Sequence, residues 1–228
     1  MGFITKMDSH CPLIVICLEI MTMVIVSHAC QNGRIYDNKV TGNDIQTIVN
    51  THNNLRAMVA RGQLRNQPPA QNMQQMTWDS QLAQRAQYWA NQCVYAHDKN
   101  RGNDVGQNIA QEYFSGHSNR QHNFTKVIYD LWFSEHVRYR YKKLGPGDSS
   151  DPATATGHYT QIVWANTNRV GCGFASYYQT QKRQDQIFYV CNYAPSGNFI
   201  GQYPYISGDP NCRANGLSNS NINGLCRR

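Results

Sequence analysis

Two runs of alternating residues in the C-terminal half of the chain constrain its fold most. Every second residue from Val170 reads Val, Cys, Phe, Ser and Tyr, and every second residue from Ile187 reads Ile, Tyr, Cys and Tyr. A period of two with many aromatic residues is typical of β-strands. The polar residues 179–186 between the runs suit a hairpin loop. Such a hairpin would bring Cys172 and Cys191 close enough to form a disulfide.

His158 lies shortly before the first of these runs and follows Gly157. Glycine lets the backbone turn at this point. A histidine placed where a loop changes into an ordered element is a candidate site residue, so the position of His158 alone draws attention to it.

An amphipathic helix is predicted near the start of the chain. Thr41–Asp44 has the form of a capping box, with aspartate in place of the usual glutamate. Apolar residues at helical spacing follow over residues 45–59, and Gly62 is a natural stop. His52 falls on the apolar face and is interpreted as a core histidine that is hydrogen-bonded to a neighbour.

Two further helices are predicted. The second is capped by Asp79 and ends at Cys93, and the third covers residues 126–141. One face of the third helix carries four residues at helical spacing: Ile128, Leu131, Trp132 and Glu135. A buried carboxylate is costly unless it has a partner, so Glu135 on this apolar face marks a polar contact inside the fold.

Residues 1–29 have the pattern of a secretory signal peptide. The apolar stretch Pro12–Val26 is followed by Ser27 and Ala29, which place small residues at the positions expected before a cleavage site. Glu19 interrupts the stretch, and a membrane anchor is the alternative. The uninterrupted apolar run is shorter than the roughly 18 residues that a span requires. We therefore expect a secreted, extracellular protein without stable membrane insertion.

The remaining chain suits one domain, because 40% of the sequence is hydrophobic and 11% is aromatic, which is enough for a core. After residue 29 the chain contains an even set of cysteines: Cys30, Cys93, Cys172, Cys191, Cys212 and Cys226. An even number in a secreted chain implies disulfides. Position favours Cys172–Cys191 across the hairpin and Cys212–Cys226 as a local loop, which leaves Cys30–Cys93. Sequence alone does not choose among the possible connectivities.

Two long segments resemble a known family. Gly157–Phe174 and Phe188–Asn198 are similar to the two signature motifs of the CAP superfamily, which comprises cysteine-rich secretory proteins, insect antigen 5 allergens and plant pathogenesis-related proteins. The resemblance covers residues 43–205. Gln67–Met73 and Trp89–Cys93 look more like the insect antigen 5 branch, found in venom or saliva, than like the vertebrate or plant branches.

The resemblance implies a fold of the α+β class. It is a three-layer α/β/α sandwich with a central, mostly antiparallel sheet, stapled by disulfides that include Cys30–Cys93 and Cys172–Cys191. The implied organisation is a signal peptide at 1–29, an N-terminal segment at 30–42, a CAP domain at 43–205 and a short cysteine-containing tail at 206–228.

Members of the superfamily often have a cleft lined by two histidines and two carboxylates. Mapped through the motifs, the histidines correspond to His97 and His158, and one carboxylate corresponds to Glu135. The second carboxylate is usually the glutamate of a Gly-Glu-Asn turn, and this chain has Gln107 there. Glutamine keeps a hydrogen-bonding oxygen but has no charge and cannot transfer a proton.

The two histidines are candidate metal ligands. Two neutral imidazoles and water can hold Zn²⁺ or Cu²⁺, but two protein ligands make a weak, exchangeable site. Gln107 weakens it further, because it supplies no carboxylate. The competing interpretation is a polar cluster that satisfies Glu135 and orders the cleft. No cofactor is therefore firmly implied, and zinc or copper are the candidates.

Three functions follow as hypotheses. The first is a secreted, non-enzymatic antigen 5-like component of venom or saliva that binds a host mediator, lipid or surface ligand. A lipid would lie between the helical stretches at 45–59 and 128–139, although such apolar stripes usually form a core. The second is a metal-dependent activity in the His97/His158 cleft, with redox chemistry if copper is bound. The third is an extracellular hydrolase using Thr160, which the absence of a Gly-x-Ser-x-Gly motif disfavours.

The charge of the chain bears on its partners. The formal net charge is +7, but Lys and Arg form no dense block and no nucleic-acid motif is present, so nucleic acid is not expected as a partner. Anionic glycans or cell surfaces are compatible with this charge. We expect a monomer, with a host extracellular protein, lipid or glycan as its ligand. Asn123 begins an N-glycosylation sequon.

Overall fold

The computed structural model describes residues 30, 33–114, 121–148 and 155–228. The predicted signal peptide, residues 1–29, lies outside the described residues. No helix in the described part of the chain is long and apolar enough to cross a membrane.

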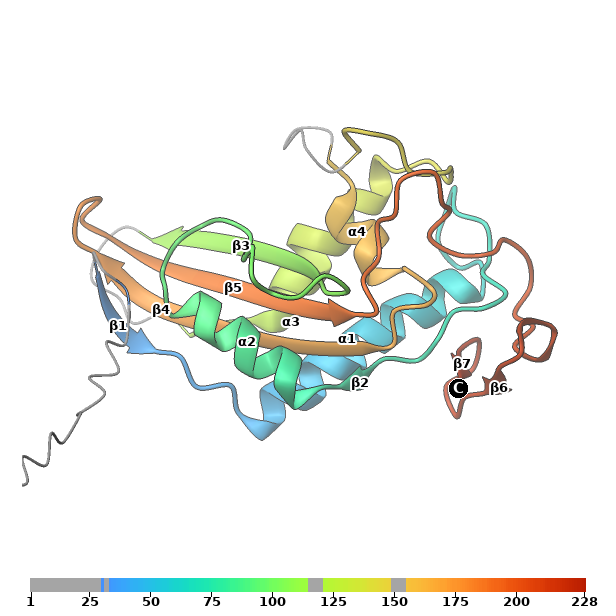
Figure 1. Cartoon of the computed structure of the whole chain (residues 1–228), viewed down its shortest axis with the longest axis horizontal. Helices are drawn as coiled ribbons and strands as arrows, with labels where there is room; N and C mark the ends of the chain where they lie inside the picture. The colour runs from blue at the N-terminus through green and yellow to red at the C-terminus, as the bar shows by residue number, and fades with distance from the viewer. Residues whose placement is uncertain (1–29, 31–32, 115–120, 149–154) are drawn as a thin grey trace, which may run out of the picture.

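A mostly antiparallel sheet forms the centre of the molecule (Figure 1). Its main path runs in the order β1 (Gly33–Asp37), β4 (Arg169–Gln179), β5 (Gln184–Ala194) and β3 (Gly106–Phe114). Short strand β2 (Thr77–Trp78) pairs with β4 and is parallel to it. β4 and β5 form the predicted hairpin, in which Cys172 lies directly opposite Cys191.

Helices cover both faces of this sheet. α1 (Gly42–Ala60) packs behind it in Figure 1, while α2 (Ser80–Ala90) packs in front against β4 and β5. Successive residues of β4 face opposite sides of the sheet. Phe174 belongs to the core beneath α1, and Ala175 belongs to the core beneath α2. The predicted three-layer α+β sandwich is thus confirmed.

α2 approaches the sheet closely at a glycine of β4. A Cβ atom on Gly173 would lie 2.5 Å from the backbone nitrogen and Cα of Gln87. No side chain fits in that space, so glycine is required for the helix to lie flat on the strand.

The predicted helix starts are confirmed. Thr41 accepts the N–H of Asp44 while the Asp44 carboxylate accepts the N–H of Thr41, which is a complete capping box. Asp79 accepts the N–H groups of Gln81 and Leu82 at the start of α2. The predicted end of the second helix is wrong by three residues, because α2 stops at Ala90 and the chain turns before Cys93.

The third predicted helix is helical but not regular. In place of one α-helix over residues 126–141, the chain forms α3 (Phe124–Lys126), a π-helical segment η1 (Val127–Trp132) and a 3₁₀ segment η2 (Phe133–Val137). Trp132 and Glu135 are buried as expected, but Leu131 is 40% exposed. A π turn holds more residues than an α turn, so the apolar face no longer follows the spacing that placed Leu131 on it.

Three further elements were not predicted. β1 lies in the N-terminal segment at 30–42, for which no strand was expected. β3 begins at Gly106, where a turn was expected, and α4 (Gly157–Ile162) contains His158. Each is short or polar, and its regular structure depends on pairing or packing with distant parts of the chain.

The three proposed disulfides are all present: Cys30–Cys93, Cys172–Cys191 and Cys212–Cys226. The last one closes a tail that has no core of its own. Leu225 and Cys226 are instead buried against the domain, where the Cys226 N–H donates to the carbonyl of Met73 and its carbonyl accepts the N–H of Gln75.

Candidate functional site

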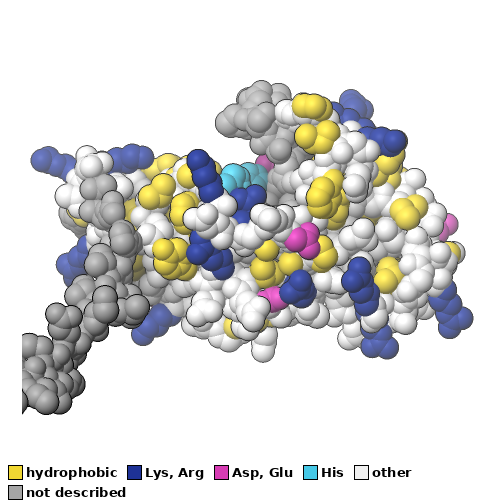
Figure 2. Space-filling view, in the orientation of Figure 1, with side chains coloured by type: hydrophobic (Ala, Val, Ile, Leu, Met, Phe, Trp, Pro, Cys, Tyr) yellow, Lys and Arg dark blue, Asp and Glu magenta, His cyan; other side chains and the backbone are white. Residues whose placement is uncertain are grey.

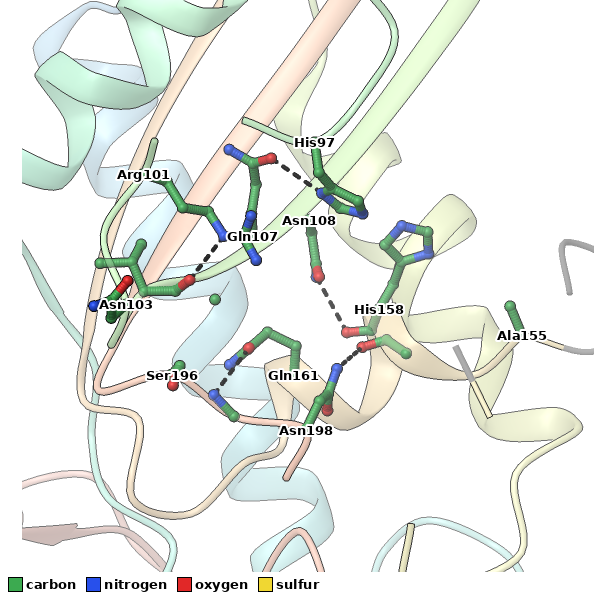
Figure 3. A pocket seen from close by; sticks show the side chains of 14 residues that line it. His97, Arg101, Asn103, Gln107, Asn108, Ala155, His158, Gln161, Ser196 and Asn198 are labelled. Carbon is green, nitrogen blue, oxygen red and sulfur yellow. Dashed lines mark hydrogen bonds between the residues drawn. The ribbon is translucent and has the colours of Figure 1, made fainter. Parts of the chain in front are cut away.

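A polar cavity of about 400 Å³ opens beside the ends of β3 and α4 (Figure 3). Its walls come from the loop after α2, the start of β3, the start of α4 and residues 196–198. Figure 2 shows histidine side chains exposed in a hollow on this face, with basic side chains next to them. Of the residues singled out from the sequence, His97, His158 and Gln107 line this cavity.

The orientation of Gln107 is set by its neighbours. Its Oε1 accepts the backbone N–H of Asp98 at 3.0 Å, and its Nε2 donates to Oδ1 of Asn192 at 2.9 Å. Asn192 in turn donates from Nδ2 to the carbonyl of Leu82. A backbone N–H only donates and a carbonyl only accepts, so both amide groups have a single consistent orientation.

This orientation decides where His97 carries its proton. The same Oε1 of Gln107 lies 3.0 Å from Nδ1 of His97. Because an amide oxygen only accepts, Nδ1 is the protonated nitrogen and the lone pair of the neutral ring is on Nε2. Nε2 makes no hydrogen bond to any residue that the structure describes.

Glu135 plays the corresponding role behind His158. It is 4% exposed and does not itself line the cavity. Its Oε2 accepts the backbone N–H groups of His158 and Tyr159 at 2.9 and 3.0 Å, and its Oε1 lies 2.7 Å from Nδ1 of His158. Glu135 therefore has the partners that its burial requires, and its carboxylate favours a proton on Nδ1 of His158.

The histidine rings are further positioned by packing and by an amide. The ring of His158 stacks on Trp132 with centroids 5.9 Å apart. Nδ2 of Asn108 donates to the carbonyl of His158 at 3.1 Å, which ties the first residues of β3 to α4. Figure 3 shows the rings of His97 and His158 next to each other at the cavity wall.

Burial lowers the pKa of His97 from its usual value, and the nearby charges of Arg101 and His158 lower it further, while the hydrogen bond to Gln107 acts in the opposite direction. A neutral amide does not stabilise an imidazolium as a carboxylate does. His97 is therefore neutral at physiological pH.

Sequence reasoning missed several residues that build the site. Arg101 and Gln161 line the cavity, and Asn192 lies behind Gln107. Strand alternation could have indicated the direction of Asn192. It stands between Cys191 and Tyr193 in a strand, so its side chain must face the opposite side of the sheet from theirs. Arg101 lies in an irregular loop, where no sequence periodicity indicates direction.

The ligand set at this site is small. Among the residues that the structure describes, no three His, Cys, Asp or Glu side chains are grouped so that they could hold a metal ion. His97 and His158 are the two imidazole side chains among the lining residues of the cavity.

Comparisons with known proteins agree with the fold. Residues 49–193 match the model of the cysteine-rich secretory protein (CAP) family. The chain is 40% identical to a salivary antigen-5 of Dipetalogaster maximus, covering 96% of this chain and 90% of that protein. It is 38% identical to venom allergen 5 of Vespula flavopilosa, covering 77% and 86%. The crystal structure of NaASP2 with Zn²⁺ is similar at a TM-score of 0.64 and 29% identity, covering 85% of this chain and all of that one. The chain therefore belongs to the CAP family and is of the antigen 5 type.

Proposed function

We propose that this chain is a secreted, non-enzymatic binding protein of saliva or venom, which acts as an extracellular monomer on a host mediator, lipid or surface ligand. The names of its relatives and its three disulfides support secretion. The observation that carries the proposal is the open polar cavity, in which both histidine rings are held by their Nδ1 atoms and keep Nε2 unengaged.

The candidate nucleophiles for hydrolysis, Thr160 and the cysteines, already take part in other interactions. Thr160 is fully buried, and its hydroxyl oxygen lies 2.8 Å from Oδ1 of Asn198 and 3.1 Å from the carbonyl oxygen of Thr156, so its single proton already has acceptors within the protein. The six cysteines of the described chain are all in disulfides and have no thiolate to offer. A nucleophile activated by a His–Glu pair therefore has no evident candidate in Thr160 or in a cysteine.

The predicted lipid channel coincides with a packed core. Ile48 and Leu55 of α1 belong to the same core as Val127 and Ile128 of η1, and none of the four is more than 3% exposed. A lipid between these helices would have to displace this packing. The polar cavity is better suited to a polar or charged mediator than to an alkyl chain.

A panel of small host mediators, such as amines, nucleotides and fatty acids, tests the proposal by thermal shift. We expect one class to raise the melting temperature of the wild-type protein, and to raise that of the His97→Ala/His158→Ala variant less. Covalent labelling of the protein by a serine- or cysteine-directed hydrolase probe would contradict the non-enzymatic proposal.

Metal binding is a second candidate, and the tautomer of His97 favours it. With protons on both Nδ1 atoms, both Nε2 lone pairs are free for Zn²⁺ or Cu²⁺, and Gln107 and Glu135 hold the rings from behind as hydrogen-bond acceptors usually do at metal sites. The donor set fits these ions, with water completing the coordination. The NaASP2 structure with Zn²⁺ adds support from a similar fold.

Isothermal titration with Zn²⁺ and Cu²⁺ tests this second candidate. We expect micromolar binding by the metal-stripped protein and no binding by the His97→Ala/His158→Ala variant. His136→Ala is the matched control, because His136 is a partly buried histidine outside the cavity. Binding that survives in the double variant, or that disappears in the control, would rule out the cavity as the metal site.

A further inference from the structure

The cavity that we propose as the ligand site carries a positive charge that the two histidines do not explain. Arg101 lines it, and none of its described lining residues is Asp or Glu. This composition depends on Gln107, because a glutamate at that position would have supplied a negative charge beside His97. The neutral residue leaves the charge of Arg101 without a counterion in the cavity wall.

The carboxylates nearest to the cavity are already engaged. Asp98 accepts two hydrogen bonds from Arg85, at 2.5 and 2.8 Å, and the N–H of Asn100. Glu135 accepts three hydrogen bonds, from His158 and Tyr159. Asp104 lies outside the lining, and its Oδ1 accepts the N–H and the hydroxyl of the lining residue Ser196, each at 3.2 Å, so its carboxylate contacts this uncharged residue and not Arg101. No ion pair links Arg101 to an acidic residue within the described chain.

Arg101 is held in place by groups that do not neutralise it. Its Nε donates to the carbonyl of Val105 and its Nη1 to the carbonyl of Asp98, each at 2.8 Å. Both contacts are to backbone oxygens within four residues, so they fix the guanidinium of Arg101, which Figure 3 labels, relative to its own loop. A guanidinium has about five N–H donors, so donors on Nη1 and Nη2 remain for a ligand.

We propose that this cavity binds a small oxyanion-bearing molecule, a carboxylate or a phosphate compound, whose anionic group is held by Arg101. Guanidinium groups match carboxylate and phosphate oxygens in charge and in planar geometry. A cavity of about 400 Å³ accommodates a small organic molecule, with its polar remainder against the amides of Gln161 and Asn198. The inference rests on the proposed function of the cavity and names the chemical class of its ligand.

The imidazole pair makes this anion subsite distinct from the metal site. In the tautomer described for His97, the unprotonated Nε2 presents a lone pair, which repels an anion and attracts a cation. Arg101 therefore attracts the anion without help from His97 or His158. The two sites can be separated by mutation.

The test uses metal-free, ¹⁵N-labelled protein at low ionic strength, titrated with acetate or with inorganic phosphate. Binding is followed in every variant through the backbone amide signals of the lining residues Val105, Gln107 and Asn198, and in the wild type also through the Nε–H signal of Arg101. We expect saturable binding, weakened about tenfold or more in Arg101→Gln, as the loss of a charge-assisted hydrogen bond implies. Arg101→Lys keeps the charge and should weaken binding less. Tighter binding of acetate identifies a carboxylate ligand, and tighter binding of phosphate identifies a phosphate ligand.

Arg34→Gln is the matched control, because it removes the same charge from an exposed residue of β1 outside the cavity. Acetamide is the uncharged ligand control. The inference is overturned if Arg101→Gln binds both anions as the wild type does, or if Arg34→Gln weakens binding equally. Unchanged melting temperatures of both variants exclude loss of folding as the cause.

The outcomes also separate this inference from the proposed function. Anion binding that persists in His97→Ala/His158→Ala and is lost in Arg101→Gln supports the subsite, whatever the metal titration gives. Mediator or metal binding in the cavity without any anion binding at Arg101 overturns the inference and leaves the proposed function standing.

Discussion

Single residues show how burial and hydrogen bonding decide which groups can titrate. His52, predicted as a core histidine, is fully buried on α1. Its Nδ1 lies 2.8 Å from the carbonyl of Ile48 and must donate to it, so its Nε2 accepts from the hydroxyl of Tyr193 at 2.9 Å. Burial lowers the pKa of His52 to about 4, and His52 is a structural group with no access to the cavity.

The low pKa of His52 makes the free energy of unfolding depend on pH. The pKa of His52 is lower in the folded than in the unfolded protein, so the unfolded state binds its proton first as the pH falls. Neutral, buried His52 therefore adds about 3 kcal/mol to the free energy of unfolding above about pH 6.5, and this stabilisation is lost as the pH falls from 6.5 to 4. Urea unfolding at pH 7 and pH 4 should therefore show a smaller pH effect in His52→Gln.

Tyr193→Phe is the control for this measurement, because it removes the hydroxyl contact but keeps the histidine. It should retain most of the pH dependence of the wild type. An equal loss of stability on acidification in the wild type and in His52→Gln would show that His52 does not contribute.

At the scale of elements, the irregular helix over residues 124–137 has the largest consequence for the site. It places Trp132 against the ring of His158 and Glu135 beneath its Nδ1, while Leu131 faces outward. π-helical segments often occur at functional sites. In this protein the irregular helix both packs against the core, through Trp132, and positions the ring of His158, through Trp132 and Glu135.

A pair of substitutions tests this assignment of faces. Leu131→Lys should change the free energy of unfolding by less than about 0.5 kcal/mol, because the side chain is already at the surface. Trp132→Ala should destabilise the protein by about 3–5 kcal/mol, because its side chain is 1% exposed. Chemical denaturation measures both changes in the free energy of unfolding. A large destabilisation by Leu131→Lys would mean that Leu131 is buried, as in the regular α-helix that the sequence predicted, and would contradict the irregular helix.

At the scale of the whole molecule, two of the three disulfides join parts of the chain that the sheet does not join. Cys30–Cys93 ties the residue preceding β1 to the loop after α2, and Cys212–Cys226 closes the tail against the domain. Cys172–Cys191 links two strands that are already paired. The first spans 63 residues and the tail disulfide spans 14.

The loop lengths predict unequal costs of removal. In the chain-entropy description, Cys30→Ser/Cys93→Ser should cost about 1 kcal/mol more than Cys212→Ser/Cys226→Ser, because the longer loop restricts the unfolded chain more. Thermal and urea unfolding of the two double variants measures the difference. A larger loss from the tail disulfide would instead mean that the tail stabilises the native domain by packing.

The sequence by itself determined what depends on residues close together in the chain. The caps at Thr41 and Asp79, the hairpin and the pairing of Cys172 with Cys191 follow from local hydrogen bonding and a period of two. Through the family resemblance, the motifs also singled out His97 and His158, which line one cavity in the structure. These features need no knowledge of how distant segments pack.

Only the tertiary structure decided the chemistry of the cavity. Gln107 orients His97 because Asn192, 85 residues later, orients Gln107. Glu135 holds His158 because an irregular helix turns it there, and Arg101 forms no ion pair within the described chain because the buried Asp98 is paired with Arg85. Tautomer, charge balance and exposure depend on contacts between segments that are remote in sequence, and no local pattern records such contacts.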